Sequence, residues 1–410
     1  MAEHDQKVAI VVPGLSDGGG VPAVAVFLRN AIQRSTRYGA DLISIAVSSR
    51  DTASVRLLAP GTWRSGPQEW VGNWQGIPFK HVGSHIAELE VARYMPRTRL
   101  TRILEEYELV QVVAGTPTFA CAVTAVSKPK CLSVATTIFQ DRATALAKER
   151  GLRRIWRAGM TGFNFVLERK VLGQMDHVFA QSAYTHRLLA DLVPEGRLSI
   201  GSPGVDTSVF RPGPGGPTSY ILAVARFSDP RKNVAMLFRA YQQVRHKLSN
   251  APRLVLAGTA GPTPEDWTVA RELGISPYIE FRKNPSIEEL AKLYREATLF
   301  ALPSNEEGFG IVLTEAMASG IPVVSTRCGG PESVVMEGET GYLTPVGDHQ
   351  AMARRLTELL TDVVRREYMG RESRRVAEQR FSIEATGRAY VDVYDRLLGC
   401  SGELSHVRPE

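Results

Sequence analysis

The sequence of 410 residues predicts an α/β protein of two domains, each built around a mostly parallel β-sheet. Three observations carry this prediction. The length suits two domains of ordinary size, apolar runs alternate with stretches of helical periodicity, and residues 203–219 are too rich in proline and glycine for a helix or a central strand. We therefore predict domains at 1–205 and 206–385, with residues 386–410 as a C-terminal helix that packs back on the first domain.

The N-terminal half begins with a strand that is one continuous apolar run, Lys7–Val12. Such a run is typical of a parallel strand buried on both faces. A loop with three consecutive glycines follows, and apolar residues at helical spacing predict a helix over 21–34. Further strands are predicted at 42–47, 109–113, 131–135, 177–180 and 198–200.

The C-terminal half resumes the alternation after the linker. Strands are predicted at 220–225, 253–257, 278–281, 299–302 and 322–325, and helices at 234–248, 265–273, 288–297 and 310–319. Residues 349–398 show helical periodicity with many arginines. Because strands and helices alternate again, the sequence predicts a second parallel sheet.

The composition excludes several classes of protein. The four cysteines are scattered without a C-x-x-C pair, so neither a disulfide scaffold nor a zinc site is predicted. No apolar run approaches the ~18 residues that a membrane-spanning helix needs, and the N-terminus does not resemble a signal peptide. We therefore expect a soluble cytoplasmic protein.

The net charge of +6 is unevenly distributed, with +7 over residues 1–205 and −1 over residues 206–410. A basic domain suggests nucleic acid or an anionic membrane as a partner, but no nucleic-acid-binding module is recognisable, so we expect no nucleic acid. Five basic residues lie among apolar ones in 151–170. This segment fits a helix on an anionic membrane, or a helix packed on its own sheet with a solvated outer face.

The most informative stretch is 304–322, where a predicted strand ends, glycines allow a turn and a helix begins near Gly310. Amides at a helix N-terminus and the helix dipole favour an anion such as a diphosphate. Glu307 precedes the helix and Glu315 lies inside it. The two carboxylates would thus face different parts of one extended ligand, although they could also be ordinary surface charges.

Two cations follow the first strand of the C-terminal half, Arg226 and Lys232. In open α/β sheets, ligands bind outside the carboxyl ends of the strands. Arg226 and Lys232 would therefore reach the crevice that holds the Glu307 loop, where both could contact one diphosphate. Without the Glu307 loop nearby, Arg226 and Lys232 would be typical of a solvated turn.

These residues resemble the retaining glycosyltransferases of family 4, which have the GT-B fold. The resemblance covers nearly the whole chain and is densest over 178–346. It rests on five motifs in order: G-V-D at 204–206 with Phe210 and Pro212, the Arg226 and Lys232 pair, E-G-F-G…E-A-M-A-x-G-x-P over 307–322, G-G-P-E at 329–332 and T-G-Y-L at 340–343.

The resemblance implies two Rossmann-like domains that face a central cleft, with a nucleotide-sugar donor bound mostly by the C-terminal domain. It implies that Arg226 and Lys232 hold the diphosphate, that Glu307 contacts hydroxyls of the donor sugar, and that Glu315 binds the ribose. It also implies that the reaction retains the anomeric configuration and needs neither a metal ion, another cofactor nor a protein general base.

The remaining donor-binding residues are implied in the same way. Gly19 and Gly20 would approach the diphosphate from the N-terminal domain, where a side chain would collide with it. Backbone amides would complete the cradle, from Phe309, Gly310, Ile311 and Val312.

One segment departs from the family pattern. Many relatives carry a histidine in a T-x-H segment that ends a middle strand of the N-terminal domain, but residues 135–142 contain none. Gln140 and Asp141 are the acceptor-side candidates for its place; otherwise the role is absent. The acceptor is unidentified, and the basic N-terminal half points to an anionic or membrane-associated one, with the protein peripheral on the inner face of a membrane.

The sequence therefore predicts a retaining, metal-independent glycosyltransferase that moves a sugar from a nucleotide-sugar donor to an acceptor hydroxyl. The acceptor is a glycan, a lipid-linked molecule or a small molecule. Two alternatives stay open: another GT-B enzyme that acts on nucleotide sugars, such as an epimerase, and a non-catalytic basic scaffold that retains the fold. A phosphorylase-like enzyme would need a lysine for pyridoxal phosphate, and the sequence offers no convincing candidate.

Overall fold

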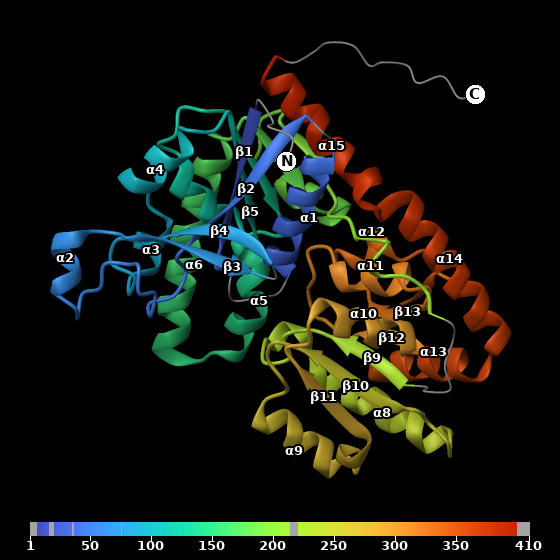
Figure 1. Ribbon diagram of the computed structural model, residues 1–410. Coiled ribbons are helices and arrows are strands. Elements are labelled where there is room, and N and C mark those ends of the chain that lie inside the picture. The colour runs from blue at the N-terminus through green and yellow to red at the C-terminus, as the bar shows by residue number, and fades with distance from the viewer. Residues whose placement is uncertain (1–5, 16–19, 35–36, 75, 214–219, 400–410) are drawn as a thin grey trace, which may run out of the picture.

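The computed structural model describes residues 6–15, 20–34, 37–74, 76–213 and 220–399. These residues form two α/β domains, with a long C-terminal helical segment running along both (Figure 1). The described strands of the first sheet all precede residue 206, and those of the second all follow it.

The N-terminal sheet has the strand order β3-β4-β2-β1-β5-β6-β7-β8. Every neighbouring pair is parallel except the edge pair β3 and β4, which is antiparallel. The strands are β1 (Gln6–Pro13), β2 (Tyr38–Ile45), β3 (Glu69–Trp74), β4 (Ile77–Val82), β5 (Leu109–Ala114), β6 (Lys130–Val134), β7 (His177–Ala180) and β8 (Leu198–Ile200).

Apolar side chains cover both faces of this sheet in two clusters, which explains why its central strands are almost wholly apolar. The helices of the domain are α1 (Gly20–Arg34), α2 (Gly61–Ser65), α3 (Glu90–Tyr94), α4 (Thr98–Leu104), α5 (Ile138–Lys148), α6 (Gly151–Leu172) and α7 (Ala183–Leu189), with a 3₁₀ helix at Pro117–Val123.

The C-terminal sheet is parallel throughout, in the order β11-β10-β9-β12-β13-β14. Its strands are β9 (Tyr220–Val224), β10 (Arg253–Gly258), β11 (Ile279–Lys283), β12 (Leu299–Leu302), β13 (Val323–Thr326) and β14 (Gly341–Thr344). Its helices are α8 (Val234–Lys247), α9 (Pro264–Glu272), α10 (Ile287–Glu296), α11 (Ile311–Ala318), α12 (Pro331–Val334), α13 (His349–Thr361) and α14 (Val363–Phe381), with 3₁₀ helices at Pro230–Lys232 and Ser276–Tyr278.

The last helix, α15 (Ile383–Leu397), returns to the N-terminal domain as expected from the sequence (Figure 1). It packs against α1, and its Tyr394 hydroxyl donates a hydrogen bond to Gln111 Oε1 at 2.8 Å. The Tyr390 hydroxyl donates to the carbonyl of Gly201 at 2.5 Å. These buried tyrosines fix α15 on the N-terminal sheet, so the chain crosses between the domains twice.

The two crossings lie side by side. The amide of Val205 donates to the carbonyl of Phe381 at 2.7 Å, and a β-carbon at Gly204 would lie 2.3 Å from Thr386 Oγ1 and 2.6 Å from the Phe27 ring. Glycine at 204 therefore permits this close approach, which gives the G-V-D motif a structural reason.

The sequence missed the hairpin of β3 and β4 and did not identify β14 as a strand. Trp63 and Trp70 are both exposed, although Trp70 also packs edge-to-face against the Phe79 ring. Packing therefore explains Trp70 only in part. Within the described residues, no helix is long and apolar enough to cross a bilayer.

Candidate active site

Two loops meet at the carboxyl edge of the C-terminal sheet. Strands β9 and β12 are hydrogen-bonded neighbours, so the segments that follow them leave the sheet side by side. The amide of Asn305 donates to the carbonyl of Arg231 at 2.7 Å, and the Asn233 side chain donates to Asn305 Oδ1 at 2.8 Å. The backbones of the Arg226 and Glu307 segments therefore lie together at this edge of the sheet, as the sequence predicts.

Lys232 and Glu307 form an ion pair in this crevice. Lys232 Nζ lies 2.6 Å from Glu307 Oε1, and both side chains are largely buried. The Ser304 hydroxyl donates to the same oxygen at 2.7 Å. Lys232 ends the 3₁₀ helix that Asp229 caps by accepting from the Arg231 amide. Local backbone structure therefore aims the ammonium at the carboxylate.

Helix α11 begins four residues after Glu307. Its N-cap, Gly310, has φ 91°, a left-handed conformation that favours glycine. The first-turn amides of Ile311 and Val312 have no acceptor within the helix, and they carry its partial positive charge. The Phe309 side chain packs against Phe381 in the core, so this residue can contribute only its backbone to the site.

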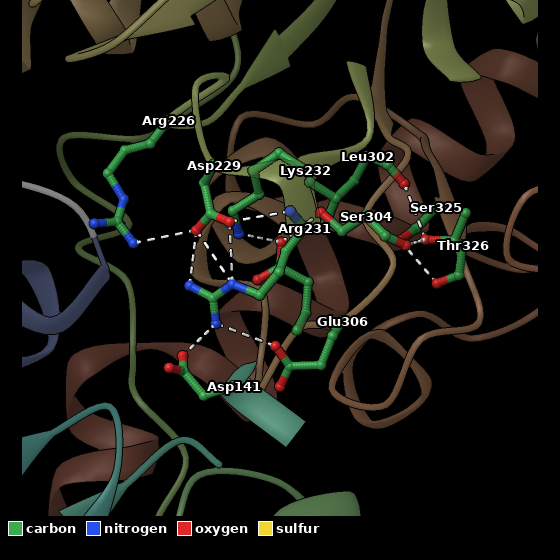
Figure 2. Close-up of polar contacts among 11 residues, drawn as sticks. Asp141, Arg226, Asp229, Arg231, Lys232, Leu302, Ser304, Glu306, Ser325 and Thr326 are labelled. Atoms are coloured by element: carbon green, nitrogen blue, oxygen red, sulfur yellow. Dashed lines mark hydrogen bonds and ion pairs between the residues drawn. The ribbon is translucent and has the colours of Figure 1, made fainter. Parts of the chain in front are cut away.

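Arg226 lies at the open side of the crevice. Its side chain is 46% exposed, and it lies 3.6 Å from Asp229 Oδ2. Figure 2 shows the guanidinium pointing away from Lys232 and toward Asp229. Arg226 is thus in the same loop as Lys232 but not in contact with the Lys232–Glu307 pair.

Residues 218–362, which include both loops, match the family model of the glycosyl transferases group 1. The C-terminal domain is a group 1 glycosyltransferase domain. The match contains Arg226, Lys232, Glu307 and Glu315, so the sequence resemblance and the family model agree on the part of the chain that carries these residues.

Curated proteins similar to the chain include two transferases. A D-inositol 3-phosphate glycosyltransferase from Corynebacterium efficiens is 34% identical over 243 residues, 54% of this chain and 57% of that protein. An MMP alpha-(1->4)-mannosyltransferase from Mycolicibacterium hassiacum is 31% identical over 275 residues, 66% of each chain. The matched part is thus about half to two thirds of the length of these relatives.

Solved structures extend the likeness to the whole fold. Sucrose-phosphate synthase from Thermosynechococcus elongatus superposes with a TM-score of 0.75 at 17% identity, covering 97% of this chain and all of that one. Anabaena HepE, solved with UDP and glucose, gives 0.70 at 16% identity, covering 95% of this chain and 99% of that one. The chain has the GT-B fold, which confirms the predicted fold class.

Within the group 1 domain, Glu315 is buried on α11 and its Oε2 accepts a hydrogen bond from the Tyr294 hydroxyl at 2.8 Å. Burial raises the pKa of Glu315 to about 7, although the Tyr294 hydrogen bond opposes the shift. The Glu315 carboxylate is therefore buried, and Tyr294 fixes its orientation.

The glycine loop of the N-terminal domain is only partly described. Gly19 lies outside the described residues. Gly20 is the first residue of α1, and a β-carbon added there would meet no described heavy atom within 4 Å. Contacts among the described residues therefore do not explain why residue 20 is a glycine. The approach of Gly20 to the diphosphate stays a prediction.

The acceptor-side candidates lie in the first turn of α5, across the cleft from the group 1 domain. Gln140 accepts a hydrogen bond from the Thr137 hydroxyl. Asp141 Oδ1 lies 2.6 Å from Arg231 Nη1, so its carboxylate is engaged with the other domain. The structure therefore shows an interdomain ion pair at Asp141, the position considered for the missing histidine.

Sequence reasoning did not single out Arg231, which is the centre of the charge network in Figure 2. Its guanidinium also lies 2.7 Å from Asp229 Oδ2 and 3.2 Å from Glu306 Oε2. Burial alone would lower the pKa of Arg231, but the carboxylates around it outweigh burial and raise it. The sequence could have pointed to Arg231, because this residue directly precedes Lys232 in the loop at the carboxyl edge of the sheet.

A pocket of about 340 Å³ opens between the domains beside this network. It is lined by Glu90, Asp141, Arg142, Trp156, Arg157, Asp229, Pro230 and Arg231. Glu306 is buried beside this network, and burial raises the pKa of its carboxyl although Arg231 and a hydrogen bond with Thr136 oppose the shift. Within the described ranges, no group of His, Cys, Asp and Glu side chains is arranged to hold a metal ion.

A buried carboxylate, that of Glu168, holds the start of α5, the helix that carries Gln140 and Asp141. Glu168 on α6 accepts hydrogen bonds from the Ile138 amide, at 3.1 and 3.2 Å to its two oxygens, and thereby caps α5. Burial raises the pKa of Glu168 to about 8. The folded state therefore retains a proton that the unfolded chain releases near pH 4.5.

This difference predicts a pH-dependent stability. The contribution of protonated Glu168 is fully present below pH 4.5 and is lost as the pH rises toward 8. Glu168→Gln should therefore stabilise the protein by about 5 kcal/mol at alkaline pH and hardly at all at acidic pH. Urea unfolding on both sides of this window measures the difference.

The exposed Glu195→Gln is the matched control and should be neutral at both pH values. An equal effect of Glu168→Gln at both pH values would contradict the assignment of the titration to Glu168.

Proposed function

We propose that this chain is a retaining glycosyltransferase that transfers a sugar from a nucleotide diphosphate sugar to an acceptor hydroxyl. The observation that carries the proposal is the contact between Lys232 Nζ and Glu307 Oε1, which are 2.6 Å apart, with Glu307 in the loop that leads into α11. A cation, a carboxylate and free helix amides together suit a ligand that has both phosphates and sugar hydroxyls.

The diphosphate is the leaving group of this reaction. As the bond between the anomeric carbon and the phosphate oxygen breaks, negative charge develops on the phosphates. Lys232, Arg226 and the α11 amides would stabilise that charge, because fixed donors act most strongly where charge develops in a site that excludes water. In the proposed complex, Lys232 contacts phosphate and Glu307 accepts from sugar hydroxyls.

The same geometry suggests how the remaining donor groups are bound. The Tyr294 hydroxyl occupies one oxygen of Glu315, which leaves the other oxygen to accept from a ribose hydroxyl. Gly19 and Gly20 would approach the diphosphate from the N-terminal domain. The new bond forms from the acceptor oxygen to the anomeric carbon, and the acceptor proton passes to the departing phosphate oxygen, so no protein base is required.

We propose that no metal ion takes part, because Arg226, Lys232 and the helix dipole supply positive charge to the phosphates. Chelation with EDTA should then leave turnover unchanged.

For the acceptor, we propose an anionic molecule. The net charge of +7 over residues 1–205 and the phosphates named in relatives such as D-inositol 3-phosphate glycosyltransferase support this proposal.

Nucleotide binding gives the first test of this function. UDP, GDP, ADP and dTDP are added separately, and thermal unfolding is followed. At least one should raise the midpoint, because a ligand that binds only the folded state stabilises it. Glu307→Gln should keep nucleotide binding but lose transfer, since it removes a contact to the sugar.

The alternatives give different results. A non-catalytic scaffold without a donor site would show no shift with any nucleotide. An epimerase would convert the donor sugar without an acceptor, whereas a transferase should yield a product that contains the acceptor, as mass spectrometry of reactions with an acceptor library would show.

A further inference from the structure

Helix α6 exposes the wrong face for a helix that packs only on its own domain. Its buried residues include Thr161, Asn164 and Glu168, which are polar. Its exposed residues include Leu152 (84% exposed), Ile155 (70%), Trp156 (67%), Phe163 (47%) and Val166 (64%). Between Thr161 and Glu168, where α6 packs on the domain, the usual amphipathic arrangement with apolar side chains inward is therefore reversed.

The exposed apolar residues form one stripe. Positions 152, 155, 156, 163 and 166 follow helical spacing, so they lie on one face over roughly 21 Å of helix at about 1.5 Å per residue. Phe139 of α5, also exposed, stacks against Phe165 next to it. No described residue before Thr161 in α6 is buried, so the first turns project from the domain, and an apolar stripe of this length marks an interaction surface.

The charges around the stripe are almost all positive. Residues 150–170 contain five arginines and a lysine, and their one acidic residue, Glu168, is buried. Glu149 precedes them and is already paired with Arg157 at 2.8 Å. An apolar stripe that includes tryptophan, on a helix whose other faces carry long cationic side chains, has the chemistry of a helix that lies in the interface of an anionic bilayer.

The stripe continues into the cleft. Trp156 and Arg157 line both the interdomain pocket beside Arg231 and a second hollow of about 530 Å³ that also includes Leu152 and Arg153. Helix α5 also contacts the 3₁₀ helix at Pro230–Lys232. A surface bound through this part of α6 would therefore lie directly beside the acceptor side of the cleft.

We propose that the exposed face of α6 is a docking surface for an anionic membrane. The apolar side chains enter the boundary between headgroups and acyl chains, and the arginines contact lipid phosphates. Because the docked face adjoins the interdomain pocket, an acceptor would reach the site from the bilayer; this last consequence rests on the proposed transferase function.

Vesicle co-sedimentation tests the docking without donor, acceptor or activity. The full chain should bind phosphatidylcholine vesicles that contain phosphatidylglycerol at low salt, and bind much less to pure phosphatidylcholine or at high salt. Leu152→Asp with Ile155→Asp should weaken binding by about tenfold or more. Replacing Arg153 and Arg154 with Gln should weaken it by about fivefold for each arginine.

The matched control is Leu58→Asp with Val71→Asp, at equally exposed apolar positions (91% and 73%) of the same domain. It should bind vesicles as the parent does, and all variants should keep the parent unfolding midpoint, because the changed side chains are exposed. The tryptophan emission of the parent should shift to the blue on vesicle addition, and Trp156→Phe should remove this shift.

Three outcomes would overturn the proposal. They are a folded parent that does not bind anionic vesicles, unchanged binding by the Leu152→Asp, Ile155→Asp variant, and a parent that dimerises through this face without binding lipid, as analytical ultracentrifugation would show. Glu307→Gln should bind vesicles normally, because docking does not use Glu307. The vesicle result therefore holds or fails independently of the transferase assignment.

Discussion

Lys232→Met is expected to lower the rate of sugar transfer about 100- to 1000-fold at saturating donor, because it removes a fixed positive charge from the leaving diphosphate. Lys232 is well placed for this role. Its ammonium lies 2.6 Å from Oε1 of Glu307, a residue of the loop that precedes α11, and the Lys232 side chain is largely buried. Steady-state kinetics with the donor found by nucleotide screening measure the loss.

A structural role of the ion pair must be separated from a catalytic one. Lys232→Met alone leaves Glu307 buried without its partner, which could disturb the fold. The double variant Lys232→Met, Glu307→Gln removes both charges, so it should regain the stability of the parent and still be inactive. Lys247→Met, an exposed change at the far end of α8, is the matched control.

Recovery of transfer by the double variant would mean that the pair only supports the loops. Activity near that of the parent in Lys232→Met would also refute the assignment of Lys232 to the diphosphate.

Arg231→Met is expected to lower the free energy of unfolding by about 3 kcal/mol, because it leaves largely buried carboxylates without their cation. Glu306 and Asp229 belong to the same domain as Arg231, whereas Asp141 belongs to the other. Burial alone would raise the pKa of Asp229, but Arg231 outweighs burial and holds it below its usual range. Urea unfolding of Arg231→Met and of the exposed control Arg388→Met measures the loss.

The same network is expected to hold the cleft closed. Asp141→Asn removes only the contact that crosses between domains, so it should cost about 1 kcal/mol or less, since Asp141 is partly exposed. Its radius of gyration in small-angle scattering should nevertheless increase, as should that of Arg231→Met. Scattering curves of both variants that superpose on that of the parent would contradict a closing role for Arg231.

Local patterns in the sequence were enough for most elements and for the donor side of the site. Strands buried on both faces appear as apolar runs whatever their neighbours are, so β1, β7 and β12 were predicted within a residue or two. The turn before α11 needs a glycine in the left-handed region, and Gly310 supplied that signal. The hairpin of β3 and β4 was missed because its polar and aromatic residues lack a strict alternation.

The sequence by itself thus determined the two α/β halves, the linker, and the placement of Lys232 and Glu307 at the carboxyl edge of one sheet. Those features depend on local periodicity and on the rule that ligands of open α/β sheets bind at the carboxyl ends of the strands. Only the tertiary structure decided that Arg231 joins Asp141 across the cleft and that α6 turns its apolar face outward. Both depend on contacts between residues far apart in the chain, and the local pattern of a helix cannot say which of its faces will be covered.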